Sequence, residues 1–184
     1  RIMYTWTMFI SLVYWKRTSN TKKQWYKFNK ALSMDKSHTE IYKDISDVYE
    51  KKRDFPKAIE AYKNYLDEMK SSPDISDLFL YGRLNYYAAT DSAYQDKQPT
   101  YLAEADTIFA QVAVKVPDNY LGNFWRARVN SLRDPETTQG LAKPYYEAAL
   151  SILEQKPDAT KSVLVECNEL FGVISYFCKM RNIT

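Results

Sequence analysis

A small residue followed four positions later by an aromatic residue recurs along this chain of 184 residues. The pairs are Ala58 and Tyr62, Ala105 and Phe109, and Ala142 and Tyr146. Residues four apart share one face of an α-helix, so each pair predicts a helix whose small residue permits a close crossing and whose ring fills the adjoining groove. Self-similarity of this kind predicts a fold of stacked helical units.

A second set of small residues predicts another helix ahead of each pair. Its members are Ser46, Gly82, Ala127 and Gly172. The spacing from Phe28 to Tyr62 is 34 residues, and Ser46 precedes Ala58 by 12 residues, as a helix–turn–helix unit requires. Pro117 follows the pair at Ala105 and lacks the backbone N–H that would continue the helix. The chain is therefore expected to alternate first and second helices.

The expected units are irregular in length: 4–37, 39–72, 74–117 and 119–156, followed by half a unit at 160–181. The extra residues of the unit 74–117 predict a surface loop at 89–100. Those of the next unit predict a turn at 133–138 in which Thr137 or Thr138 caps the following helix. Three or more units bury a continuous core, so we expect one domain. Because the chain starts at Arg1 and its helical pattern runs to its end, we expect it to be a piece of a longer protein.

These residues resemble the tetratricopeptide repeat, whose signature spaces an aromatic or apolar residue, Leu-Gly, Tyr, Ala, Phe and Pro at set intervals. The segments VPDNYLGNFWRARVNSLRDPETTQGLAKPYYE and ATKSVLVECNELFG are most similar to uncharacterised tetratricopeptide proteins of Bacteroidales. The resemblance implies an all-α fold, a right-handed superhelical array of antiparallel helix pairs (an α-solenoid). It also implies a bacterial protein, in the cell envelope or periplasm if a signal precedes this sequence.

Charge and hydropathy argue against nucleic-acid and membrane partners. The chain has 26 basic and 23 acidic residues, a net charge of +3 that by itself predicts no nucleic-acid binding. The basic run from Lys16 to Lys30 is expected to be a solvated helix face and turn. The apolar segment 1–15 is shorter than the roughly 18–20 residues of a membrane span, so it predicts a buried terminal helix instead.

The residues of catalytic and metal sites are scarce. His38 is the one histidine, and no Cys-x-x-Cys, His-Glu-x-x-His, Gly-rich phosphate loop or Gly-x-Ser-x-Gly motif is present. We therefore expect no enzymatic activity, no cofactor and no metal. Cys167 and Cys178 are eleven residues apart in one expected helix. At about 1.5 Å per residue their α-carbons are roughly 16 Å apart, too far for a disulfide, so both are expected to be free thiols.

The resemblance implies a ligand site on the concave surface, which the first helix of each unit lines. The candidate binding residues lie in the units 74–117 and 119–156: Phe79, Arg83, Tyr86, Tyr87, Phe124, Trp125 and Arg128. Phe79 and Arg83, like Phe124 and Arg128, are four apart and share a helix face, and aromatic and guanidinium groups are typical of peptide-binding hot spots. The alternative is that the rings are inter-helix core and the arginines pair with local acids.

The remaining inward positions are Lys43, Asp47, Glu50, Glu169, Val173 and Tyr176. Chaperone-tail recognition is disfavoured, because that subclass requires Asn one turn after Lys and here Asp47 follows Lys43. Arg126 stands where an apolar residue is usual and is expected to pair with Glu147 or Asp134.

Three functions follow from these features. The first is a scaffold that binds a protein or peptide on the concave face. The second is a structural spacer that self-associates through residues 1–15. The third is an accessory component of envelope or carbohydrate-uptake machinery, with Tyr and Trp stacking on sugars.

Overall fold

The structure, a computed structural model, describes residues 39–69, 71–155 and 161–181. The chain separates into two compact units, 1–41 and 42–184, and the packing reported below is that of the second. The expected unit 4–37, the basic run, His38 and the segment 1–15 lie outside the described residues.

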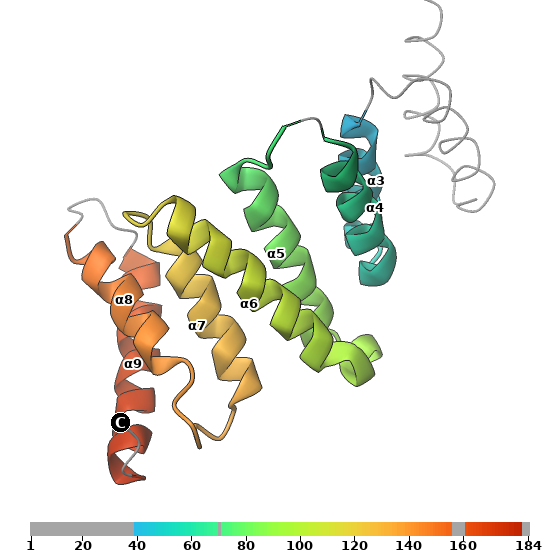
Figure 1. The fold of residues 1–184 in the computed structure, drawn as a ribbon. Coiled ribbons are helices and arrows are strands. Elements are labelled where there is room, and N and C mark those ends of the chain that lie inside the picture. The colour runs from blue at the N-terminus through green and yellow to red at the C-terminus, as the bar shows by residue number, and fades with distance from the viewer. Residues whose placement is uncertain (1–38, 70, 156–160, 182–184) are drawn as a thin grey trace, which may run out of the picture. The chain divides into compact units, whose positions relative to one another are not determined.

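The described residues are all-α, as the repeated pattern predicts (Figure 1). The helices are α3 (Glu40–Lys51), α4 (Phe55–Glu68), α5 (Ile75–Thr90), α6 (Gln98–Lys115), α7 (Leu121–Arg133), α8 (Lys143–Leu153) and α9 (Lys161–Met180), with a 3-10 helix, η1 (Ser92–Lys97), between α5 and α6. The main packing joins helices that are consecutive in the sequence, from α4 against α5 to α8 against α9. The fold is thus a series of neighbouring helices rather than a bundle around one central helix.

Each second helix of the described pairs has a proline in its first turn. Pro56, Pro99 and Pro144 lie in the first turn of α4, α6 and α8. The first N–H groups of a helix have no partner within the helix, so proline loses nothing there and its fixed φ favours the helical start. The prolines therefore mark where the chain turns back to close each pair.

The small residues of the first helices allow the close crossings that the sequence predicts. Ser46 Oγ donates to the carbonyl oxygen of Ala58 across 2.8 Å, joining α3 to α4. A Cβ atom on Gly82 would lie 2.8 Å from Cε1 of Phe109, so any larger residue there would displace that ring. Ala127 is fully buried. Gly172 differs, because a Cβ atom there would meet no atom of the described structure within 4 Å.

At Gly122 two helices approach each other closely, and the repeat spacing did not predict this contact. A Cβ atom on Gly122 would lie 2.5 Å from the backbone nitrogen of Ala113, so α7 crosses α6 with backbone against backbone. This crossing lies between two successive pairs rather than within one.

The structure contradicts two expectations about the segments between helices. The segment 89–100 is not a loop, because α5 extends to Thr90, η1 follows and α6 begins at Gln98. Asp91 starts η1 by accepting a hydrogen bond from Ala93 N, and the insertion lengthens the helical structure while remaining on the surface. Likewise, neither Thr137 nor Thr138 caps α8, which begins at Lys143 after Ala142 with no side-chain cap.

Candidate functional site

The expected binding residues lie on α5 and α7, and most of their rings are packed. Trp125 is at the centre: its ring stacks on Phe109 at 5.4 Å between centroids and meets Tyr86 at 5.2 Å and Phe79 at 5.7 Å, both edge-on. Only 8% of Trp125 is exposed, and Phe124 and Tyr86 are also buried. Edge-on and stacked pairs of this kind add to the energy of burial, so these rings hold α5, α6 and α7 together.

The two arginines of the set lie on this aromatic cluster. The Arg128 guanidinium is 5.0 Å from the Trp125 ring and 5.5 Å from the Tyr86 ring, while 34% of its side chain remains exposed. The Arg83 guanidinium is 5.7 Å from the Tyr87 ring, with 30% of the side chain exposed. Cations at this distance from an aromatic face are attracted by its quadrupole. Both guanidinium groups of the candidate site therefore lie on a floor of rings, with about a third of each arginine side chain exposed.

Each arginine also faces a carboxylate on a neighbouring first helix. Arg83 Nη2 is 3.6 Å from Glu50 Oε1 of α3, and Arg128 Nε is 3.4 Å from Glu166 Oε1 of α9. Both distances exceed the roughly 2.7–2.9 Å of a strong charge-assisted hydrogen bond. Nε of Arg83 is buried and has no hydrogen-bond partner in the described structure. Neither carboxylate therefore holds its guanidinium in a close, two-bond ion pair.

A cavity of about 220 Å³, with several charged residues in its lining, lies between α3 and α5. Its lining includes Arg83 together with Lys43, Asp47 and Glu50, the inward positions expected in α3. Lys43 Nζ is 2.8 Å from Asp77 Oδ1, a buried carboxylate at the start of α5. The positive and negative side chains at this end of the site therefore partly neutralise one another.

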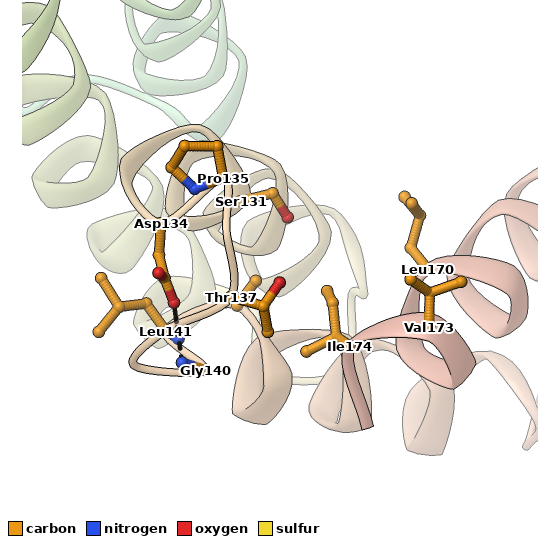
Figure 2. Close-up of a pocket in the computed structure, with 10 residues that line it drawn as sticks. Ser131, Asp134, Pro135, Thr137, Gly140, Leu141, Leu170, Val173 and Ile174 are labelled. Atoms are coloured by element: carbon orange, nitrogen blue, oxygen red, sulfur yellow. Dashed lines mark hydrogen bonds between the residues drawn. The ribbon is translucent and has the colours of Figure 1, made fainter. Parts of the chain in front are cut away.

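A second cavity, of about 170 Å³, is lined by Ser131, three positions after Arg128 in α7, and by Leu170, four positions after Glu166 in α9. Figure 2 shows this cavity. Leu170, Val173 and Ile174 of α9 form one wall, and Ser131 with the turn that follows α7 forms the other. Ser131 Oγ is buried without a hydrogen-bond partner in the described structure. The cavity is thus largely apolar.

Asp134 holds the turn that closes this cavity. Its carboxylate accepts hydrogen bonds from the backbone N–H groups of Thr138, Gln139 and Gly140 and from the Thr138 hydroxyl. Burial alone would raise the pKa of Asp134, but the hydrogen bonds from Gln139, Thr138 and Leu141 outweigh it and lower the pKa below its ordinary value. The turn is therefore organised around an ionised carboxylate.

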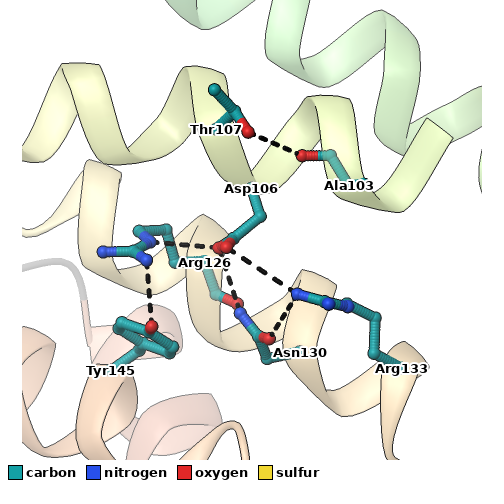
Figure 3. A network of polar contacts seen from close by, with 7 residues as sticks. All are labelled: Ala103, Asp106, Thr107, Arg126, Asn130, Arg133 and Tyr145. Atoms are coloured by element: carbon teal, nitrogen blue, oxygen red, sulfur yellow. Dashed lines mark hydrogen bonds and ion pairs between the residues drawn. The ribbon is translucent and has the colours of Figure 1, made fainter. Parts of the chain in front are cut away.

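Arg126 pairs with a different acid from those expected. Its Nε donates to Asp106 Oδ1 at 3.0 Å, and its Nη2 donates to the Tyr145 hydroxyl at 2.9 Å (Figure 3). Glu147 and Asp134 were the wrong partners, because the side chain reaches across to α6. Asn130 and Arg133 join the same Asp106 carboxylate, so this network connects α6, α7 and α8.

The described residues contain no group of three or more His, Cys, Asp or Glu side chains placed to hold a metal ion. Cys167 and Cys178 are free and buried, as their spacing predicts. None of the described helices is long and apolar enough to cross a membrane. Sugar stacking needs exposed ring faces. The rings of Tyr86, Phe124 and Trp125 are buried and leave little surface exposed for such stacking.

The sequence pointed to the arginines and the rings but missed much of their surroundings. No local sequence pattern predicts the roles of Glu166 and Asp106 or the apolar cavity. Each depends on which turn of one helix faces another helix. Asp134 had one signal, an Asp-Pro break followed by Gly140, which adopts a positive φ of 69°.

Comparison with known proteins supports the helical-repeat fold. No protein-family model and no curated protein matches the chain. The chain is similar to the C-terminal part of a TPR repeat-containing protein from Cytophaga hutchinsonii, with a TM-score of 0.65 and 28% identity. The match covers 83% of this chain and 55% of the solved chain, so this sequence spans about half the length of that relative. The chain therefore has the all-α, helical-repeat fold of tetratricopeptide proteins.

Proposed function

We propose that the chain is a protein-interaction scaffold that binds a peptide segment along the side of α5 and α7 that carries Arg83 and Arg128. The observation that carries the proposal is the position of Arg128, which rests on Trp125 and Tyr86 while a third of its side chain stays exposed. Arginine held on a rigid aromatic floor loses little conformational entropy on binding, which favours affinity.

The chemistry of the surface favours a ligand with a carboxylate beside an apolar side chain. A guanidinium group binds a carboxylate through two parallel hydrogen bonds, and the long distances to Glu50 and Glu166 leave donors for this contact. One turn farther along, the cavity beside Leu170 and Val173 has room for an aliphatic side chain.

The test is selection of peptides from a displayed random library against the folded chain, followed by affinity measurement with fluorescently labelled synthetic peptides. We expect the selected peptides to share an acidic and an aliphatic residue. Arg128→Glu should weaken binding by at least about tenfold, equivalent to about 1.4 kcal/mol, because a repelling carboxylate replaces the guanidinium. Arg128→Lys should give a smaller loss, since it keeps the charge without the planar fork.

Lys63→Glu is the matched control, because it makes the same change of charge on an exposed position of α4. Circular dichroism should be unchanged in all three variants. Equal affinity of the parent chain and an Arg83→Glu, Arg128→Glu double variant would refute this site. Self-association through residues 1–15 stays a separate prediction, and a monomer in sedimentation with and without those residues would rule it out.

A further inference from the structure

The extra residues between α5 and α6 contact the helix pair that precedes them. The small residue of the first helix precedes the ring of the second helix by 16 positions from Ser46 to Tyr62, but by 27 positions from Gly82 to Phe109. The added length contains η1. No residue of η1 is buried, so this segment adds little to the core.

Asp91 and Tyr94 hold the turn between α3 and α4. Arg53, in that turn, donates to Oδ2 of Asp91 from Nε at 3.0 Å and from Nη2 at 2.8 Å. The Tyr94 hydroxyl donates to the carbonyl oxygen of Arg53 at 3.2 Å, and its ring meets Phe55 edge-on at 6.3 Å between centroids. Oδ1 of Asp91 accepts from Ala93 N, so one carboxylate both starts η1 and binds the turn. We call Arg53, Asp91 and Tyr94 the clasp.

The backbone of Arg53 supports a role for its side chain. Its φ is 58°, in the left-handed region that glycine adopts most readily. Arginine in this conformation is strained, and such strain persists where the surrounding contacts impose it. The guanidinium contacts with Asp91, a buried carboxylate, are contacts of this kind.

The pair α3–α4 is also attached to α5 near the start of that helix. Lys43 Nζ of α3 is 2.8 Å from Asp77 Oδ1. The hydroxyls of Tyr62 and Tyr65 of α4 donate to the same carboxylate at 3.4 and 3.3 Å. The Tyr62 ring stacks on Tyr81 at 5.9 Å between centroids. Aromatic packing therefore reinforces this attachment, while the clasp fixes the other end of α5.

We propose that the clasp sets the width of the cavity between α3 and α5, and that opening it lets the pair α3–α4 rotate about the contacts at Asp77. The lining residues of the two helices, 43–50 and 80–84, fall between the two attachments. Because 73% of the Arg53 side chain is exposed, its ion pair contributes little to overall stability, and its main effect is on the position of α3–α4. The clasp does not depend on what the arginines bind.

The test measures one distance by pulsed electron paramagnetic resonance, between nitroxide labels at Lys63→Cys in α4 and Gln111→Cys in α6. Both positions are exposed, and the native thiols are buried, so the label reacts with the introduced cysteines. We expect a narrow distance distribution in the parent chain and a broader one after Asp91→Asn or Arg53→Gly. Glycine suits the left-handed backbone, so Arg53→Gly removes the guanidinium without straining the turn.

Asp96→Asn is the matched control, because it makes the same change on an exposed acid of η1 that lies outside the clasp. Its distribution should equal that of the parent chain. Unchanged distributions in both clasp variants would overturn the proposal, since the packing of α4 on α5 would then set the spacing alone. Equal broadening by Asp96→Asn would overturn it as well, because any change in η1 would have the same effect.

Peptide affinity gives a second readout, which rests on the proposed function. If the width of the cavity varies, only a fraction of the molecules is competent to bind at Arg83. The apparent Kd of the Asp91→Asn chain should then rise by the reciprocal of that fraction. In an Arg83→Glu background Asp91→Asn should cause no further rise. A broader distance distribution with unchanged affinity would keep the clasp and contradict the placement of the ligand at Arg83.

Discussion

Arg126 Nε donates to Asp106 Oδ1 across 3.0 Å, and this contact joins two successive helix pairs rather than the two helices of one pair. Asn130 Nδ2 donates to the same oxygen at 3.0 Å. Asp106→Ala leaves both donors without their acceptor, so we expect a loss of about 1–3 kcal/mol in the free energy of unfolding. Urea unfolding followed by circular dichroism measures it.

Asp47→Ala provides the comparison for Asp106→Ala, because it removes an ion pair with Lys51 that is exposed on α3. Exposed pairs contribute little, so its urea midpoint should stay close to that of the parent chain. Equal midpoints for the two variants would show that the Asp106 network does not stabilise the junction of α6 and α7.

The two close-approach glycines should differ in their tolerance of alanine. A Cβ atom on Gly82 would meet Cε1 of Phe109 at 2.8 Å, and a ring can tilt aside. A Cβ atom on Gly122 would meet the backbone nitrogen of Ala113 at 2.5 Å, which can move only if α6 and α7 separate. We expect Gly82→Ala to cost about 1–3 kcal/mol and Gly122→Ala to cost more. Thermal unfolding that ranks them in the reverse order would contradict this account.

The difference between these glycines shows what the sequence could predict. Gly82 was identified because it recurs at the small position of a first helix, where the spacing to Phe109 is informative. Gly122 lies at a crossing between successive pairs, and such crossings depend on the angle at which units stack, which no local spacing encodes. For the same reason the partner of Arg126 was expected among nearby acids and is found on α6.

Asp134 should make the stability of the chain depend on pH in the acid range. Its pKa is lower in the folded state than the ordinary value of 3.8, so the unfolded chain binds a proton more readily. The stabilisation is complete above the ordinary pKa and is lost as the pH falls through the lowered value. Asp134→Asn should cost about 1–3 kcal/mol at neutral pH and flatten this dependence, measured as urea midpoints from pH 7 down to acid. An unchanged slope would contradict the assignment.

Cys167 should be unreactive in the folded chain. Burial, with a smaller contribution from the neighbouring Glu166 carboxylate, raises the pKa of its thiol to about 11. The thiolate is the nucleophile, so a buried neutral thiol reacts slowly with Ellman's reagent at pH 8. Cys178 is also buried. We expect both thiols to react fully only after addition of urea, and rapid release of one equivalent from the native chain would show that α9 opens readily.

The candidate site was predictable in its residue types but not in its burial. The four-residue spacing placed Phe124 and Arg128 on one face of α7, but a helix face several residues wide meets both a neighbouring helix and solvent. Which ring is covered depends on α5 and α6 together. Trp125 therefore belongs to the packed interior, while Arg128, three positions later, reaches solvent because its long side chain extends past the rings.

The main packing of this chain joins sequence neighbours, and this has a consequence for cooperativity. In such a linear array the folding free energy is a sum of local terms and nearest-neighbour couplings, so one end can open while the middle stays folded. The strongest coupling lies around Trp125, where α5, α6 and α7 share one set of rings. Backbone amides there should exchange with solvent last and those of α9 early. A ligand bound to Arg128 would then slow amide exchange in the helices next to this segment, which is itself already the slowest to open.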